Sequence, residues 1–204
     1  MKTETDMGSR QRENSNPTEA ESSPHADPAP HDEGRLPELA RRTVETFVRE
    51  GRVPETPPVA DDSLLGLRAA CFVSIKTDEG DLRGCIGTVE PTKATLAEEL
   101  IHNAISAATR DPRFLPVSAP ELPYLRYSVD VLSPPEPTRF EELNPKTYGL
   151  IVEDGRGRRG LLLPDLEGVE TPEQQLQITA RKAGIASGAG DVKLYRFRVR
   201  RYGE

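Results

Sequence analysis

A thiol, a cation and two glycines fall within one run of seven residues, Leu82-Arg83-Gly84-Cys85-Ile86-Gly87-Thr88. Glycines inside a strand weaken it and usually mark a bulge or the close approach of another backbone. A pliable backbone beside a thiol could hold an anion or expose a nucleophile, and an adjacent cation raises the thiolate fraction of a thiol. The run is therefore the first candidate for chemistry, with Cys85 as the nucleophile and Arg83 as its stabiliser.

A structural explanation of the same run stays open. Free cysteine is among the most buried residue types, so Cys85 could be a small core residue. Gly84 and Gly87 would then make room for a packed helix. The residues alone favour this explanation over a reactive thiol.

His102 is the one histidine outside the N-terminal 35 residues, and so the one imidazole available as a base for Cys85. It lies one residue, or about 100°, from the apolar stripe of its expected helix, which favours a surface position. Asp111 and Arg113 follow the same helix. They could frame a polar cleft beside the glycine run, or they could be a helix-end acid and its ion-pair partner.

Three arginines, Arg156, Arg158 and Arg159, lie in a Gly-rich turn and could grip phosphate, although such a turn is more often a solvated hairpin tip. The sequence has no phosphate loop of the Walker type, no dinucleotide fingerprint, no nucleophile elbow and no zinc-ligand spacing. We therefore expect no metal site, and the residues identify no cofactor.

Charge is unevenly distributed along the chain. Residues 1–35 contain no Val, Ile, Leu, Phe, Tyr or Trp, and carry a net charge of 4 − 8 = −4 out of a total of −7. Such a segment cannot bury enough apolar surface to offset the entropy of ordering. We predict a disordered acidic tail over 1–35 and a folded domain over 36–204. The negative balance argues against general nucleic-acid binding, which depends on neutralising phosphates.

The sequence shows no secretory signal and no run of about 18 apolar residues of the kind that crosses a membrane. We therefore expect a cytoplasmic protein that does not contact a membrane. In that compartment its two cysteines, Cys71 and Cys85, are expected to be reduced rather than bridged.

Hydrophobic periodicity places the elements that must position these residues. We predict helices over 36–50, 96–109 and 171–183, and strands over 69–76, 82–89, 124–132, 148–153, 159–163 and 192–200. Thr95 and Glu98 form a capping-box pattern at the start of the second helix. Strands 124–132 and 192–200 alternate polar and apolar residues, so one face of each should be wet. Consecutive strands with short connections favour an α+β fold, a mostly antiparallel sheet flanked by helices with one sizeable core and a small lobe.

Several motifs in this order resemble the AMME-syndrome candidate-region family, also called the AMMECR type. They are Leu82-Arg83-Gly84-Cys85-Ile86-Gly87, Asn103-Ala104, Asp111-Pro112-Arg113-Phe114, Val131-Leu132-Ser133-Pro134-Pro135, Gly160-Leu161-Leu162-Leu163-Pro164 and Arg181-Lys182-Ala183-Gly184. The resemblance covers residues 37–200. It implies an α+β fold with a larger and a smaller subdomain, and Memo-like and radical-SAM proteins as partners in microbes. It adds Asn103, Asp111 and Arg113 as neighbours of Cys85, so that with Arg83, Gly84 and Gly87 of the run they make up the expected binding residues.

The resemblance supplies no reaction, so alternatives remain. The first is a cysteine-centred enzyme, or a subunit of a modification system, with Cys85 as nucleophile and His102 as a weak candidate base. The second is a non-catalytic ligand-binding or scaffold protein in which the glycine run forms a groove. Nucleic-acid binding through Arg113 and the arginines of the 156–159 turn is a third, disfavoured by the charge and by the lack of interleaved aromatic residues.

Overall fold

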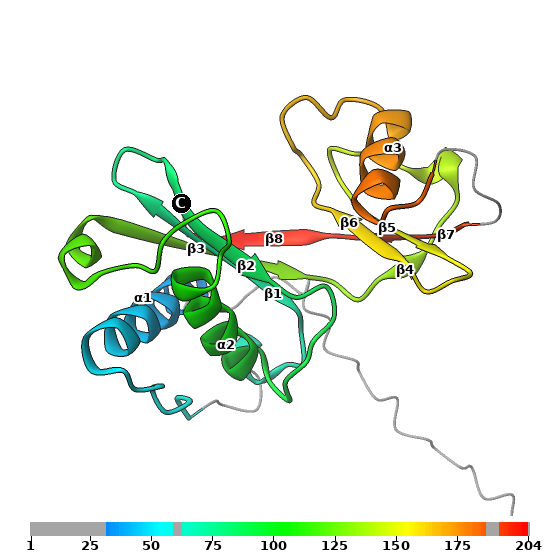
Figure 1. Cartoon of the computed structure of the whole chain (residues 1–204). Helices are drawn as coiled ribbons and strands as arrows, with labels where there is room; N and C mark the ends of the chain where they lie inside the picture. The colour runs from blue at the N-terminus through cyan, green and yellow to red at the C-terminus, as the bar shows by residue number, and fades with distance from the viewer. Residues whose placement is uncertain (1–31, 59–62, 187–191, 204) are drawn as a thin grey trace, which may run out of the picture.

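A computed structural model describes residues 32–58, 63–186 and 192–203. These residues form two four-stranded antiparallel sheets with helices on their faces (Figure 1), which confirms the expected α+β class. The acidic tail predicted over 1–35 lies outside the described residues up to position 31. The first helix begins at Asp32, four residues before Leu36, where we expected order to start.

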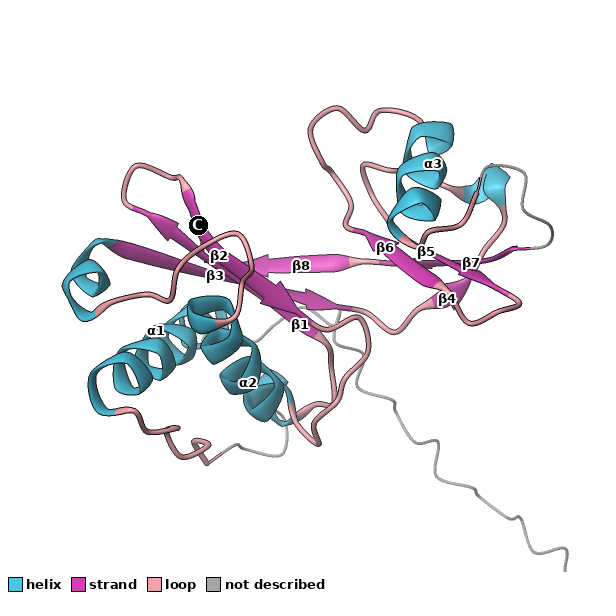
Figure 2. Cartoon of the chain, viewed as in Figure 1, coloured by secondary structure: helices cyan, strands magenta, loops and turns pink. Residues whose placement is uncertain are grey.

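The larger subdomain is built on a sheet with the strand order β2-β1-β3-β8. Two helices, α1 and α2, pack on one face of this sheet (Figure 2) and bury its apolar side chains, such as Val73, Ile75 and Val129. Its elements are α1 (Asp32–Glu50), β1 (Cys71–Thr77), β2 (Leu82–Gly87), α2 (Leu96–Thr109), β3 (Leu125–Leu132) and β8 (Val199–Tyr202).

The smaller subdomain is built on a sheet with the order β4-β7-β5-β6. Helix α3 packs on β5 and β6 and closes a separate apolar cluster that includes Leu150 and Val152. Its elements are β4 (Glu136–Pro137), β5 (Gly149–Asp154), β6 (Arg159–Leu162), α3 (Pro172–Lys182) and β7 (Val192–Phe197). Three short 3₁₀ helices complete the described fold, at Leu64–Gly66, Ala119–Tyr124 and Phe140–Glu142.

Local sequence signals explain where the helices of the two subdomains begin. The side chain of Thr95 accepts a hydrogen bond from the backbone N–H of Glu98, and the Glu98 carboxylate accepts one from the backbone N–H of Thr95, so the expected capping box is present at α2. Thr171 and Gln174 repeat the arrangement at α3. None of the helices in the described ranges is both long and apolar enough to cross a membrane.

The expected last strand over 192–200 is in fact two strands. β7 belongs to the smaller sheet and β8 to the larger one, and the chain passes between them at Arg198 (Figure 1). The backbone of Arg198 bonds to Ser133 instead of a strand, its N–H to Oγ and its carbonyl to the amide, each at 2.9 Å. Alternation of side chains does not reveal such a change of partner sheet.

A second difference concerns β3. Its polar residues Ser128 and Asp130 are buried, although the alternation predicted a wet face for them. β3 is a central strand between β1 and β8, and Arg201 from β8 covers Asp130 with two hydrogen bonds. The alternation is present in β3, but the Arg201 side chain from the neighbouring strand covers Asp130, so this part of the polar face is not exposed.

Apolar contacts join the two sheets. Ala70 and Leu132, at the edge of the larger subdomain, share one cluster with Ile151 and Phe197 of the smaller one. The ring of Phe197 lies over Gly149, where an added Cβ would come within 2.2 Å of it. This glycine therefore allows the two strands and the ring to pack without a gap.

Candidate active face around Cys85

The glycines of the 82–88 run are explained by packing. A Cβ added to Gly84 would lie 2.3 Å from the carbonyl oxygen of Ala107 in α2, and one added to Gly87 would lie 2.2 Å from the ring of Phe72. Gly84 thus faces the helices and lets α2 approach β2 closely. The expectation that these glycines make room for a helix therefore holds for Gly84, whereas Gly87 makes room for the Phe72 ring of the neighbouring strand.

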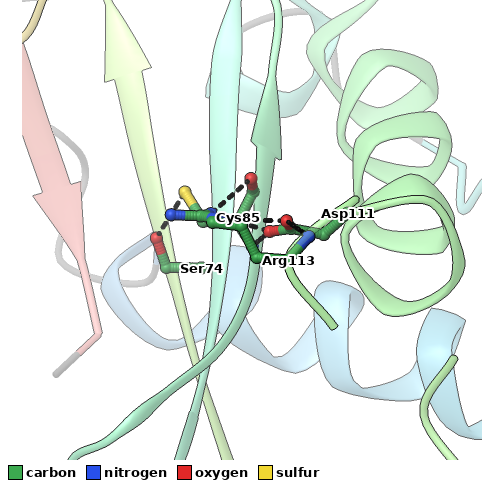
Figure 3. A network of polar contacts seen from close by, with 4 residues as sticks. All are labelled: Ser74, Cys85, Asp111 and Arg113. Atoms are coloured by element: carbon green, nitrogen blue, oxygen red, sulfur yellow. Dashed lines mark hydrogen bonds and ion pairs between the residues drawn. The ribbon is translucent and has the colours of Figure 1, made fainter. Parts of the chain in front are cut away.

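Cys85 follows Gly84 in the strand, so its side chain points to the opposite face of the sheet, away from the helices. It is half-buried, and its Sγ accepts a hydrogen bond from the hydroxyl of Ser74, 3.2 Å away on β1 (Figure 3). The two residues are cross-strand partners. Cys85 is therefore not a core residue, although the residues alone favoured that position.

Asp111 and Arg113 reach the outer edge of β2 from the loop after α2 (Figure 3). A carboxylate oxygen of Asp111, a side chain only 2% exposed, accepts the backbone N–H of Cys85 at 2.8 Å. Arg113 donates to the same carboxylate from Nε at 2.9 Å and Nη2 at 2.7 Å, and Nη2 also lies 3.5 Å from the Cys85 carbonyl. These two side chains occupy hydrogen-bonding positions that a further strand would fill.

The ion pair has an electrostatic consequence. The hydrogen bond from Arg113, with help from the amides of Cys85 and Arg113, holds the pKa of Asp111 well below its usual range despite burial. Asp111 is therefore a fixed anion at any physiological pH. It is suited to positioning Arg113 and Cys85, not to accepting a proton.

A second arginine is held in the same way. Arg201 donates to Asp130 from Nε at 2.7 Å and from Nη2 at 2.8 Å, and the Asp130 side chain is only 4% exposed. The side chains of Arg113 and Arg201 are themselves 54% and 58% exposed. Their Nη1 groups have no hydrogen-bond partner in the described part of the chain, so each arginine can still bind an anion.

Both guanidinium groups lie within electrostatic reach of Cys85. The pKa of each arginine is raised first by its hydrogen-bonded aspartate, and the charge of a Cys85 thiolate adds to the effect at both. Sequence reasoning identified Arg113 but missed Arg201, Asp130 and Ser74. Arg201 and Asp130 are 71 positions apart, and only strand pairing brings them together.

A cleft of about 350 Å³ adjoins Arg201 between the two subdomains. Asp130, Val199 and Arg201 line it on the larger side, and the segments 146–147 and 163–166 line it on the smaller side. Within it Asp165 adopts a positive φ of 54°, the one such residue other than glycine in the described ranges. Backbone in this region is uncommon outside glycine, although aspartate tolerates it better than most residues.

Other predicted site residues lie elsewhere. Arg83 pairs with Glu121 at 2.7 Å, and this bond lowers the pKa of Glu121 to about 2. Arg83 is therefore engaged in an ion pair with the 3₁₀ helix Ala119–Tyr124 and is not directed at Cys85. His102 is exposed on α2, across the sheet from Cys85. Asn103, the next residue of α2, is buried and donates to the Cys71 carbonyl at 3.0 Å, which makes it a packing residue between α2 and β1.

Cys71 is fully buried on the helix-facing side of β1, and desolvation raises its pKa to about 12. Both cysteines are free, as the expected compartment suggested. They cannot be bridged, because they lie on opposite faces of the sheet. Among the described residues no group of three or more His, Cys, Asp or Glu side chains could hold a metal ion.

The arginines of the 156–159 turn are largely used within the fold. Arg158 pairs with Asp154 at 2.7 Å and Arg159 pairs with Glu90. Arg156 is exposed. The turn is therefore a solvated hairpin tip, and two of its three arginines are already paired with acids instead of being available to a phosphate.

Comparison with known proteins agrees with this fold. A protein of Thermotoga maritima is 54% identical over 164 residues, which cover 80% of this chain and 94% of that protein. A protein of Clostridium acetobutylicum is 46% identical over 167 residues, or 81% of this chain, but this match spans only 35% of its length.

The crystal structure of an uncharacterized protein from Pyrococcus horikoshii superposes with a TM-score of 0.73 at 32% identity, covering 85% of this chain and 92% of that one. The family model of AMMECR1 matches residues 37–202. The match contains the Cys85 face, the smaller subdomain and the cleft between them. The chain belongs to the AMMECR1 family.

Proposed function

We propose that this chain is a ligand-binding protein whose site is the face of the larger sheet around Cys85, and that it binds an anionic group there. The supporting observation is the pair of exposed arginines, each fixed by a buried aspartate and each with a free Nη1, on the same face as a half-buried thiol. An arginine that binds one carboxylate through Nε and Nη2 still presents another edge to a second anion.

The fixed geometry favours binding for a physical reason. Holding a long side chain in one rotamer costs conformational entropy when it occurs on binding. Here Asp111 and Asp130 have already ordered the two arginines in the free protein. The adjoining cleft of about 350 Å³ is within the range that small molecules fill.

Two alkylating reagents of different charge test this proposal through Cys85. Iodoacetate is an anion and iodoacetamide is neutral. The rate with iodoacetate divided by the rate with iodoacetamide therefore reports the local attraction for anions at Cys85, because the intrinsic reactivity of the thiol cancels in the ratio. Cys71 is fully buried and will not contribute. We expect Arg113→Gln and Arg201→Gln each to lower this ratio several-fold relative to the native protein.

Glutamine can still donate to the aspartate, which protects the fold. Arg156→Gln is the matched control, because it removes one exposed arginine at a distant turn. If the ratio falls equally in Arg156→Gln, only the net charge matters and the proposal is wrong. A native ratio no higher than that of a small free thiol would also contradict it.

A cysteine-centred enzyme is the second candidate, because the thiol is accessible and lies near two cations, a setting that promotes thiolate chemistry. Iodoacetamide alkylation of Cys85 followed against pH tests this candidate. A rate that has already reached its plateau at neutral pH supports it. A rate that reaches its plateau only above about pH 8, as for a free thiol, is evidence against an activated nucleophile.

The family resemblance supports a further element of the proposal, that Memo-like and radical-SAM proteins are partners in a modification system. In that system this chain would present the bound anionic substrate. Size-exclusion chromatography of the mixed proteins tests the assembly. Failure of both candidate partners to co-elute with the full-length chain would remove this element and leave the ligand site unaffected.

A further inference from the structure

The chain crosses between the two subdomains twice at one place. It leaves β3 through Ser133 and returns from β7 through Arg198, and these two residues hydrogen bond to each other across the crossing. A separate cavity of about 280 Å³ opens here, lined in part by Ser133, Tyr148, Arg196 and Arg198. None of its lining residues belongs to the Cys85 face or to the cleft beside Arg201.

Two guanidinium groups lie over one aromatic ring in this cavity. The carbons at the centres of the Arg196 and Arg198 guanidinium groups are each 4.8 Å from the ring centroid of Tyr148. Arg198 also donates from Nη2 to the Tyr148 hydroxyl at 2.8 Å. Stacking orients a planar guanidinium and leaves its edge free for a carboxylate or phosphate.

The positive charge of this pair is incompletely matched. Nε of Arg196 is buried without a hydrogen bond of good geometry, but it forms an ion pair at 3.5 Å with Glu136, an exposed acid that also lines the cavity. Glu142 lies further still, at 3.9 Å from Nη1 of Arg196. Arg198 has no acidic partner among the described residues. Arg196 is therefore balanced by two long ion pairs, whereas the exposed guanidinium of Arg198 keeps its charge available to a ligand.

We propose that this cavity is a second binding site, for a small oxyanion presented as a phosphate group or a carboxylate. The anion accepts hydrogen bonds from the free edge of Arg198, and Arg196 on the same ring holds Tyr148 and Arg198 in place. The cavity holds a small molecule rather than a peptide. Bound at the crossing, the anion ties the two connecting segments together and stabilises the arrangement of the subdomains.

Isothermal titration of the full-length chain with inorganic phosphate, and separately with succinate, tests the proposal at constant ionic strength set with chloride. We expect at least one of the two to bind, and the one that binds identifies the group as phosphate or carboxylate. Arg198→Ala should weaken that binding by about tenfold or more, because it removes a charge-assisted donor. Arg198→Lys keeps the charge but loses the planar fork and should also weaken it.

Arg156→Ala is the matched control, since it removes an exposed arginine of the same charge outside the cavity. Any binding of these anions at the Cys85 face depends on Arg201, whereas the binding step that Arg198→Ala removes should persist in Arg201→Gln, which separates the two sites. The proposal is overturned if neither anion binds, or if Arg198→Ala and Arg156→Ala weaken binding equally. Loss of binding in Arg201→Gln but not in Arg198→Ala would assign the anion to the other site and also overturn it.

Discussion

Buried aspartates define the chemistry of the Cys85 face at the scale of single residues. Asp111 and Asp130 are both nearly inaccessible, and an arginine from the surface binds each of them with two hydrogen bonds. Burial of a carboxylate without such a partner would favour its neutral form. The buried aspartates thus hold the two exposed arginines in fixed orientations, as a small anion site requires.

Asp111→Asn should reveal this arrangement through the pH dependence of stability. The pKa of Asp111 is lowered in the folded state, so the unfolded chain takes up a proton near pH 4 that the folded chain refuses. The stabilisation is complete above about pH 4 and is lost as the pH falls toward the folded pKa. At pH 7 we expect the variant to be less stable by about 1–3 kcal/mol.

Urea unfolding at pH 7 and near pH 3 measures the effect. The difference between the native protein and Asp111→Asn should shrink at the lower pH. Asp78→Asn is the control, because Asp78 is an exposed aspartate paired with Arg126 at 3.1 Å and should change stability little at either pH. A difference that stays constant with pH would mean that Asp111 is not ionised in the native state as described.

Residue types in sequence predicted part of this site. Asp111 and Arg113 were identified because they follow a helix near the glycine run, and the structure places them on the backbone of Cys85. Arg201 and Asp130 were not identified, because their pairing depends on the register of β3 and β8. The type of a polar residue in a strand does not indicate which side chain of a neighbouring strand will cover it.

At the scale of elements, the approach of α2 to β2 depends on a missing side chain. Gly84→Ala would place a Cβ 2.3 Å from the Ala107 carbonyl, so the helix or the strand must move. Backbone atoms cannot rotate away as a flexible side chain can. We expect a loss of about 1–3 kcal/mol in the free energy of unfolding.

Gly155→Ala provides a matched comparison in chemical denaturation. Nothing lies within 4 Å of a Cβ added to Gly155, so that variant should match the native protein within about 0.5 kcal/mol. Equal effects of the two substitutions would show that helix packing does not explain Gly84.

The elements themselves were largely predictable. Capping boxes at Thr95 and Thr171 located the starts of α2 and α3, and alternation located β3. The start of α1 was predicted four residues late, at Leu36, because the apolar spacing begins there, whereas the helix begins at Asp32 and contains Pro37. The break at Arg198 was not predictable from alternation, because the side chains keep their period on both sides of it.

At the scale of the whole molecule, a small apolar cluster joins the subdomains. Phe197 lies in it with Leu132 from the larger sheet and Ile151 from its own. Because these contacts cross between the sheets, we expect the described domain to unfold in one cooperative transition. Phe197→Ala should lower the free energy of unfolding by about 3–5 kcal/mol and should affect both subdomains.

Scanning calorimetry together with circular dichroism checks this expectation. The calorimetric and van't Hoff enthalpies should agree in the native protein. Val53→Ala serves as a control, because Val53 is an exposed apolar residue and its loss should be nearly neutral. Two separate transitions in the native protein would show that the cluster does not couple the subdomains.

The occupied edge of β2 also bears on how copies of the protein behave toward each other. An edge strand with unpaired amides and carbonyls can recruit a strand from another molecule and begin aggregation. At Cys85 that edge is already filled by Asp111 and Arg113, a charged pair that a hydrophobic strand could not displace without burying ions. The loop that shapes the site therefore also protects the concentrated protein from self-association along this strand.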